Sequence, residues 1–187
     1  MKKKGKLIII SGPSGVGKGT LIQKLFENRE LPLVLSVSAT TRPPRPGEKN
    51  GIDYHFFSQN EFDRLKKEGS FLEFFEVFGR HSYGTLKQDV DNALEKGKWV
   101  VLEIDVNGAK QVLEQYPQAK TIFILPPNQQ TLHQRLTHRG SESEEIIQQR
   151  LNESQKEIEQ GKLYQYQIIN DEISKAVQEL TQVIVAD

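Results

Sequence analysis

The sequence predicts an α/β domain built on a mainly parallel sheet, and three features lead to that prediction. Short apolar runs alternate with helical patterns along most of the 187 residues. Most of these runs are apolar at consecutive positions, as strands buried on both faces of a parallel sheet should be. A glycine-rich segment joins the first run to the first helical pattern, and this order of strand, loop and helix is typical of layered α/β domains.

The expected strands and helices alternate along the chain. The strands are Leu7–Ile10, Leu33–Val37, Trp99–Ile104, Thr121–Leu125 and Gln167–Ile169. The helices, whose apolar residues recur three or four positions apart, are Leu21–Phe26, Leu86–Leu94, Ala109–Tyr116, Gln130–Leu136 and Ile146–Ile158. Trp99 begins one of the strands and is expected in the core.

Two segments interrupt this alternation. The first, about Ser38 to Gln88, is rich in aromatic and turn residues, and we expect a small antiparallel insertion there. Ser58 and Glu61 form a capping box that predicts a helix within it. The second, Pro126 to about Gln160, carries arginines on two helices and is expected to be a mobile lid. The prediction is one domain with a core of residues 1–37, 89–125 and 161–187, an insertion of residues 38–88 and a lid of residues 126–160.

Composition excludes several classes of protein. The 25 basic and 25 acidic residues give no overall field to recruit nucleic acid or an anionic membrane. No stretch approaches membrane-spanning length. The absence of cysteine excludes disulfides, thiol catalysis and thiolate metal sites, and it fits a cytoplasmic protein. The four histidines are scattered without metal-ligand spacing, so we expect surface or packing roles for them.

The glycine-rich segment predicts a nucleoside triphosphate site. Glycines let backbone N–H groups turn toward an anion, the following helix N-terminus adds positive partial charge, and Lys18 can reach the β- and γ-phosphates. The alternative is a glycine-rich turn with a surface lysine, but the buried strand before it and the helix after it favour the site. The expected ATP-binding loop is Gly12, Pro13, Ser14, Gly15, Val16, Gly17, Lys18, Gly19 and Thr20.

One position in this loop departs from the usual pattern. Gly19 stands where a serine or threonine hydroxyl commonly meets Mg²⁺, and Thr20 follows one place later. We therefore expect Mg²⁺ to be held mainly by nucleotide phosphates and water.

A second anion site is predicted in the loop Arg42–Glu48. Prolines at positions 43, 44 and 46 stiffen the backbone, so Arg42 and Arg45 have little freedom to lose on binding. Guanidinium groups bind phosphate oxygens in pairs. A solvated basic turn is the alternative, and the neighbouring phosphate loop makes a nucleotide kinase the better interpretation.

Further motifs follow these two sites in order. They are Ser36–Glu48, Gly51–Tyr54, Phe71–Glu73, Tyr83–Thr85, Leu102–Asp105, Ile122–Pro127, Arg135–Leu136 with Arg139–Gly140, and Ile169–Asp171. In these motifs the sequence resembles the guanylate kinase family, from about Leu7 to the C-terminus. The resemblance implies a P-loop NTPase core with a parallel sheet flanked by helices, a small antiparallel GMP-binding insertion and a helical lid. It implies transfer of the γ-phosphoryl group of ATP to GMP in purine nucleotide metabolism, with Mg²⁺ as cofactor and dGMP left open as a substrate.

The resemblance also implies roles for single residues. Those matching the family's GMP phosphate ligands are Arg42, Arg45, Tyr54 and Tyr83, and those around the guanine base are Ser38, Glu73, Thr85 and Asp105. Those matching the arginines over the ATP phosphates are Arg135, Arg139 and Arg150, with Asn170 near the adenine. Lys18, Arg42 and these three arginines are the expected catalytic residues. Glu103 departs from the family's usual aspartate, and Mg²⁺ is expected near Thr20 and Glu103.

Chemistry supports guanine as the base. Guanine presents N1–H and a 2-amino group side by side, and the Glu73 carboxylate can accept from both, whereas adenine would leave that buried charge unpaired. The alternative for Glu73 is a solvent-facing strand residue. The acceptor is already an anionic phosphate, so no general base is needed; cations must neutralise charge and water must be excluded.

Two other functions stay open. One is a guanylate-kinase-like module that binds protein ligands and has lost catalysis, which the retained Lys18 and arginines argue against. The other is a P-loop kinase of a different small phosphorylated acceptor, and Ser38, Glu73 and Thr85 favour guanine over that.

Overall fold

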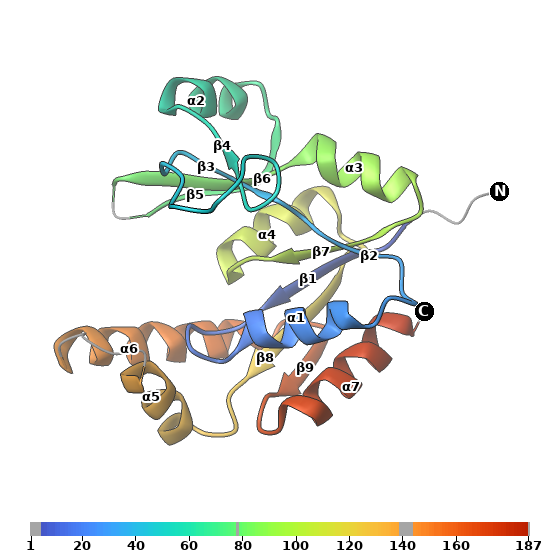
Figure 1. The fold of residues 1–187 in the computed structure, drawn as a ribbon. Coiled ribbons are helices and arrows are strands. Elements are labelled where there is room, and N and C mark those ends of the chain that lie inside the picture. Colours follow the sequence, from blue (N-terminus) through green and yellow to red (C-terminus); the bar gives the residue numbers. More distant parts are fainter. Residues whose placement is uncertain (1–4, 78, 139–143, 187) are drawn as a thin grey trace. The chain divides into compact units, whose positions relative to one another are not determined.

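The computed structural model describes residues 5–77, 79–138 and 144–186, which form two sheets and the helices around them (Figure 1). The first sheet has five strands in the order β2-β7-β1-β8-β9. Their bounds are β1 Leu7–Ser11, β2 Leu33–Leu35, β7 Trp99–Glu103, β8 Lys120–Leu125 and β9 Tyr166–Ile169. The pairs β2–β7, β1–β8 and β8–β9 are parallel. The α/β fold with a parallel sheet is therefore confirmed.

The second sheet has four strands in the order β4-β3-β6-β5. Their bounds are β3 Ser38–Thr40, β4 His55–Phe56, β5 Phe71–Val77 and β6 His81–Leu86. The pairs β3–β6 and β5–β6 are antiparallel, as expected for the insertion, whereas β3 and β4 run parallel, so the sheet is mixed. The segment 41–54 between β3 and β4 is long enough to carry the chain back to the starting end, which a parallel pair requires.

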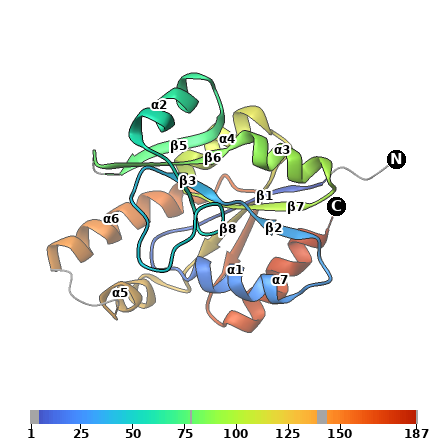
Figure 2. The ribbon, with the colours of Figure 1, turned by 45° about the horizontal axis from the view of Figure 1, so that its top comes forward.

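Seven helices are present in the described residues. They are α1 Lys18–Glu27, α2 Gln59–Lys67, α3 Lys87–Glu95, α4 Val106–Gln115, α5 Gln129–His138, α6 Glu144–Gly161 and α7 Ile173–Val185. The capping box predicted for α2 is confirmed: Ser58 Oγ accepts from the Glu61 N–H at 3.3 Å, and Glu61 Oε2 accepts from the Ser58 N–H at 2.9 Å. The last helix, α7, was not expected. Figures 1 and 2 show it beside α1.

The chain divides into two compact units. The first comprises Met1–Leu7, Pro32–Leu102 and Asn107–Ala119, and the second comprises Ile8–Leu31, Glu103–Val106 and Lys120–Asp187. The three-part division into core, insertion and lid stays a prediction. Within the part of the chain that the structure describes, no helix is both long enough and apolar enough to cross a bilayer.

Each unit has its own apolar core. In the second unit the central residues of β1 and β8 are fully buried, among them Ile9, Ile10 and Phe123. In the first unit the rings of Phe62 and Phe71 stack with centroids 4.4 Å apart. Trp99 is less buried than expected, because it begins its strand; its ring lies under Lys6 Nζ at 4.6 Å.

The free edge of the second sheet is covered within the first unit. Gln111 of α4 donates to the Phe74 carbonyl of β5 at 3.2 Å and accepts from the Phe74 N–H at 3.3 Å. Gln115, one helical turn later, donates to the Leu72 carbonyl at 3.1 Å. These side chains replace a strand partner at Leu72 and Phe74, so these backbone groups are satisfied and this part of β5 is held in place.

Candidate active site

The phosphate loop lies in the second unit, between β1 and α1. Gly15 and Gly17 have φ values of 81° and 95°, a left-handed conformation that favours glycine. Gly17 is also the N-cap of α1, and a Cβ there would lie 2.7 Å from Asn170 Nδ2. Glycine is needed at this position for both conformation and space. The loop leads the N–H groups of the first turn of α1 toward the position of a bound anion.

Lys18 is the first residue of α1 and folds back on the loop. Its ammonium donates to the carbonyl oxygens of Gly12 and Pro13, the second at 3.4 Å. An ammonium has three donors on a compact charge, so Lys18 can keep a loop contact and still donate to a phosphate oxygen.

Arg135 of α5 and Asn170, which follows β9, hold the loop from two further elements. Arg135 Nη1 donates to the Val16 carbonyl at 3.1 Å, and Nη2 donates to the Asn170 carbonyl at 3.2 Å. Asn170 Nδ2 donates to the same Val16 carbonyl at 2.8 Å. These bonds fix the loop before any nucleotide arrives, which lowers the entropy lost on binding.

A buried serine and a half-buried tyrosine form a hydrogen-bonded pair at the end of β1, where the loop begins. Ser11, the last residue of β1, donates from Oγ to the Ile104 carbonyl at 2.7 Å, and the Tyr164 hydroxyl donates to Ser11 Oγ at 2.8 Å. Burial raises the pKa of Tyr164 to about 12, and the carboxylates of Asp105 and Glu157 add to the rise although the Ser11 bond opposes it. Tyr164 is therefore a neutral donor at physiological pH.

Glu157 of α6 adds a carboxylate to this part of the second unit. Burial raises its pKa, the charge of Lys18 opposes that rise, and the carboxylates of Asp105 and Glu153 add to it. Lys18 thus interacts with a carboxylate of α6, and Asp105 from the segment after β7 interacts with that same carboxylate. A nucleotide polyphosphate would compete with Glu157 for the Lys18 ammonium.

The first unit holds the predicted second anion site, and Glu48 organises it. Glu48 accepts from Arg42 Nη2 with both carboxylate oxygens, at 2.8 and 3.0 Å, and from the Arg45 N–H at 2.7 Å. The bond to Arg42 lowers the pKa of Glu48 and raises the pKa of Arg42. The carboxylate therefore fixes the Arg42 guanidinium and the loop backbone, while the Arg45 side chain is exposed.

Two tyrosines lie next to Arg42. The rings of Tyr54 and Tyr83 meet edge to face with centroids 6.2 Å apart, and Arg42 Cζ lies 5.3 Å from the Tyr54 ring centroid. Phe75 stacks on Tyr83 at 5.6 Å and supports it. Phenol and guanidinium groups are all donors, so this cluster can bind a phosphate.

A buried carboxylate lies further along the same sheet. Glu73 of β5 is 2 % exposed, and its Oε1 accepts from the Thr85 hydroxyl at 2.7 Å. Thr85 is also buried and pairs with Ser38 of β3 across the sheet. The alternative of a solvent-facing Glu73 is wrong, because a side chain this buried is not part of a solvated face.

The register of the sheet orders these groups into two rows. One row is Ser38, Thr85 and Glu73; the next, two residues along each strand, is Thr40, Tyr83 and Phe75. Residues two apart point to the same face of a strand and lie about 7 Å apart. The carboxylate and the tyrosine of the arginine cluster therefore lie on one face, with the spacing of two parts of one ligand.

Comparison with known proteins assigns the chain to a family. The family model for guanylate kinase matches residues 4–187. A guanylate kinase from Lactobacillus acidophilus is 46% identical over 187 residues, which is all of this chain and 91% of the relative. The chain is a member of the guanylate kinase family. A guanylate kinase from Nostoc is 49% identical over 174 residues, 93% of this chain and 86% of the relative.

Solved structures support the same assignment. The crystal structure of guanylate kinase from Anaplasma phagocytophilum has a TM-score of 0.75 and 33% identity, covering 98% of this chain and 86% of that one. Guanylate kinases are ATP:GMP phosphotransferases, and this chain has that activity. The fold, the family and the enzyme class expected from the sequence are confirmed.

The structure places the predicted site residues in two groups. The loop Gly12–Thr20, Lys18, Arg135, Arg150 and Asn170 belong to the second unit, and Ser38, Arg42, Arg45, Tyr54, Glu73, Tyr83 and Thr85 belong to the first. Asp105, expected near guanine, belongs to the second unit, where it interacts with Glu157 and Tyr164. Arg139 lies outside the described residues. The role of each residue stays a prediction.

Glu48 and Glu157 are two of the contributors that the sequence analysis missed. Glu48 was expected only as part of the loop and had no role. It lies three residues from Arg45 and six from Arg42, a spacing that lets its carboxylate accept hydrogen bonds from both and close the loop. Glu157 gave no local signal, because its partner Lys18 is far away in the sequence.

Proposed function

We propose that this guanylate kinase binds ATP on the phosphate loop of the second unit and GMP on the mixed sheet of the first. Lys18 and the loop N–H groups would bind the β- and γ-phosphates, with Arg135, Arg139 and Arg150 adding positive charge. Arg42, Arg45, Tyr54 and Tyr83 would bind the GMP phosphate. The observation that supports the proposal is the pair of rows on one sheet face, in which the Glu73 carboxylate lies one row away from Tyr83 of the arginine cluster.

Glu73 would select guanine. Its carboxylate can accept from N1–H and from the 2-amino group, while the Thr85 hydroxyl holds Oε1 in place. A base with an acceptor at N1 would leave the buried charge without a proton to meet it, and such sites reach discrimination of about 10⁴. Ser38 and Asp105 are the remaining proposed contacts to the base.

Phosphoryl transfer would then depend on position and charge. The attacking oxygen of GMP is already an anion, so no side chain has to remove a proton. The cations bring two repelling polyanions together and neutralise the charge that builds on the transferred group. Glu157 would shift its interaction with Lys18 when the ATP phosphates arrive, because both compete for the ammonium.

Mg²⁺ fits this site only together with a nucleotide. Among the described residues no group of three His, Asp or Glu side chains could hold a metal ion, and Gly19 supplies no hydroxyl. Thr20 and Glu103 are both exposed, in the second unit, and can meet water ligands of the ion. When bound with ATP, Mg²⁺ supplies positive charge to the β- and γ-phosphates.

The test is formation of ADP from MgATP with GMP, dGMP, AMP, CMP and UMP offered separately to the purified protein. We expect rapid ADP formation with GMP and at least about 10³-fold less, in kcat/KM, with AMP. Lys18→Ala, which removes the ammonium from the loop, should abolish the signal and exclude a contaminating kinase. ADP formation that is equal with GMP and AMP would refute the base assignment. ATP binding without any acceptor-dependent ADP would favour a protein-binding module instead.

A further inference from the structure

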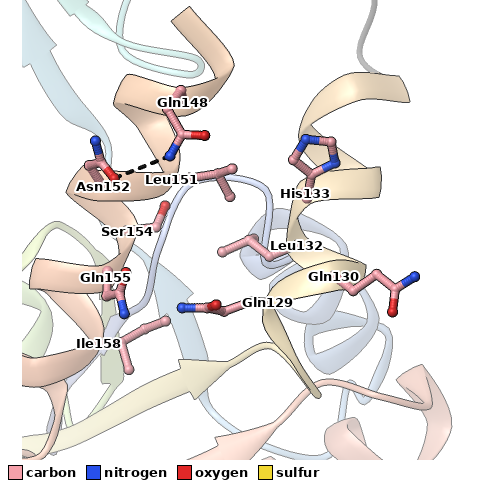
Figure 3. A pocket seen from close by; sticks show the side chains of 10 residues that line it. All are labelled: Gln129, Gln130, Leu132, His133, Gln148, Leu151, Asn152, Ser154, Gln155 and Ile158. Atoms are coloured by element: carbon pink, nitrogen blue, oxygen red, sulfur yellow. Dashed lines mark hydrogen bonds between the residues drawn. The ribbon is translucent and has the colours of Figure 1, made fainter. Parts of the chain in front are cut away.

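A cavity of about 320 Å³ lies between α5 and α6 in the second unit (Figure 3). It is lined by Gln129, Gln130, Leu132, His133, Gln148, Leu151, Asn152, Ser154, Gln155 and Ile158. None of these residues belongs to the proposed ATP or GMP site. Its volume is at the lower end of the range for small-molecule sites, which is about 300–1,000 Å³.

The cavity wall holds a buried hydroxyl that nothing in the described residues satisfies. Ser154 of α6 is 1% exposed, and its Oγ has no hydrogen-bond partner among the described residues. A buried hydroxyl without a partner costs free energy, and most native structures avoid it. Because Ser154 lines the cavity, a ligand there is the natural partner for this group.

The rest of the lining defines the chemistry of that ligand. Five carboxamides line the cavity, and Figure 3 shows the amide groups of Gln129 and Gln155 pointing toward one another from α5 and α6. Gln148 donates to Asn152 Oδ1 at 3.3 Å, and its own carbonyl oxygen points toward α5. Each carboxamide offers a donor and an acceptor at the same place.

Charge and apolar surface narrow the ligand class further. None of the ten lining residues is Asp, Glu, Lys or Arg, so neither an anion nor a cation finds a counter-charge in the wall. His133 is the one titratable group, and its Nε2 lies 3.8 Å from the exposed Glu144 carboxylate. Leu151 and Ile158, which are half-buried, supply apolar surface on which a flat ring can lie, and the buried Leu132 lies behind this surface.

We propose that the cavity between α5 and α6 binds an uncharged heteroaromatic carboxamide. The ring lies against the leucine and isoleucine side chains, and the ligand amide pairs with glutamine side chains and with Ser154 Oγ. This site is separate from the proposed catalytic roles and does not depend on them.

One residue that lines the cavity also lies next to the phosphate loop. Leu132 lines the cavity, and its Cδ1 lies 3.5 Å from the position that a Cβ on Gly15 would occupy. Arg135, one turn later on α5, donates to the Val16 carbonyl of the same loop at 3.1 Å. A ligand that shifts Leu132 therefore changes the packing of the phosphate loop and its affinity for ADP. By reciprocity, ADP bound at the loop changes the affinity of the cavity for its ligand.

The test uses two probes that share a ring and differ in charge, nicotinamide and nicotinate. Each is titrated at pH 7.5 into ¹⁵N-labelled full-length protein saturated with GMP, so that the guanine site is filled, and amide shifts are followed. We expect saturable shifts on α5 and α6 with nicotinamide and none with nicotinate. Shifts of equal size with both probes would overturn the proposal. The absence of a saturable shift with nicotinamide at concentrations up to about 50 mM would overturn it as well, because this range covers the weak affinities of small fragments.

Paired variants locate the binding. Ser154→Ala removes the hydroxyl and Gln148→Ala removes a lining carboxamide; we expect each to weaken nicotinamide binding about 2- to 10-fold, the effect of one hydrogen bond. Gln149→Ala is the matched control, because Gln149 is exposed, bonds Glu153 at 3.2 Å and does not line the cavity. All three variants should keep kinase activity, which shows that they fold. An equal loss in Gln149→Ala and Gln148→Ala would place the probe elsewhere and overturn the proposal.

The coupling is measured by repeating the nicotinamide titration with and without saturating ADP. A change in the dissociation constant of threefold or more, about 0.7 kcal/mol, supports the link through Leu132. Equal dissociation constants would overturn the coupling.

Discussion

We propose that single residues decide which base this kinase accepts, and Glu73 is the sharpest case. Replacing Glu73 with Gln keeps its size but removes one acceptor and the charge that is proposed to face guanine N1–H and the 2-amino group. We expect the ratio of kcat/KM for GMP over AMP to fall about 10- to 100-fold, the range for one lost charge-assisted hydrogen bond. Glu76→Gln, an exposed carboxylate on the same strand, is the control and should leave the ratio unchanged. An unchanged ratio in Glu73→Gln would remove this residue from the base site.

Gly19 tests how the metal is held. It lies in the first turn of α1 in a helical conformation, and a Cβ built on it meets no atom within 4 Å, so Gly19→Ser fits without strain. If phosphates and water hold Mg²⁺, the serine should change the Mg²⁺ concentration for half-maximal rate by less than about threefold, as expected for a nucleotide-bound ion. A titration of activity against free Mg²⁺ at fixed ATP measures this. A gain of tenfold or more in the apparent affinity for Mg²⁺ would show that the absence of a hydroxyl group at position 19 weakens Mg²⁺ binding in the parent.

Glu157 links the phosphate loop to pH. Burial raises the pKa of Glu157 in the folded protein above its value in the unfolded chain. At pH values between the two pKa values the folded protein binds more protons than the unfolded chain, so the free energy of unfolding falls as pH rises through this range. Glu157→Gln removes the buried charge, so the variant without nucleotide should melt at a higher temperature than the parent at pH 7.5. The gain should shrink toward pH 4, where the parent carboxyl is protonated as well. Melting curves at both pH values decide this, and a gain that persists at pH 4 would contradict it.

Helix α2 shows how a local signal sets an element. Its capping box satisfies N–H groups at the first turn through Ser58 and Glu61. Ser58→Ala should lower the free energy of unfolding by about 1 kcal/mol, measured by urea denaturation with unchanged m-value. Ser174→Ala is a suitable control, since Ser174 is exposed in the first turn of α7 and donates to Glu172 without capping a backbone group. Equal losses in both variants would show that the α2 cap contributes nothing special.

The elements also show what periodicity can and cannot predict. All five strands of the parallel sheet were predicted within two residues of their ends. For β1, β7 and β8 the reason is that a strand buried on both faces needs a continuous apolar run. The pairing of β4 could not be found this way, since two residues carry no direction and the return path through residues 41–54 decides it. The helix α7 could have been found: Ala176, Leu180 and Ile184 recur at helical spacing and are buried.

Across the whole molecule, the candidate sites show that local sequence does not reveal contacts between residues far apart in the chain. Residues inside contiguous motifs, such as Lys18 and Arg42, were assigned from spacing and resemblance. The contacts that hold them were not, because Glu157 and Tyr164 reach the phosphate loop from positions more than a hundred residues away. The groups that would touch phosphate thus come from local sequence and stay a prediction, whereas the groups that hold or oppose them are seen only in the folded chain.

Binding of substrates should stabilise the molecule by mass action, and this separates the two proposed sites. A ligand at 100 times its dissociation constant adds about 2.7 kcal/mol to the free energy of unfolding. For a chain of this length that corresponds to a rise in melting temperature of about 5–10 °C. We expect GMP and ADP each to give such a rise in the parent. In Glu73→Gln, at the same ligand concentrations, the rise with GMP should fall by about half, because a tenfold weaker site leaves the GMP only about ten times above its dissociation constant. The rise with ADP should be unchanged, since ADP is proposed to bind the phosphate loop in the other unit. Loss of both rises would mean that the substitution disturbs the fold rather than the guanine site.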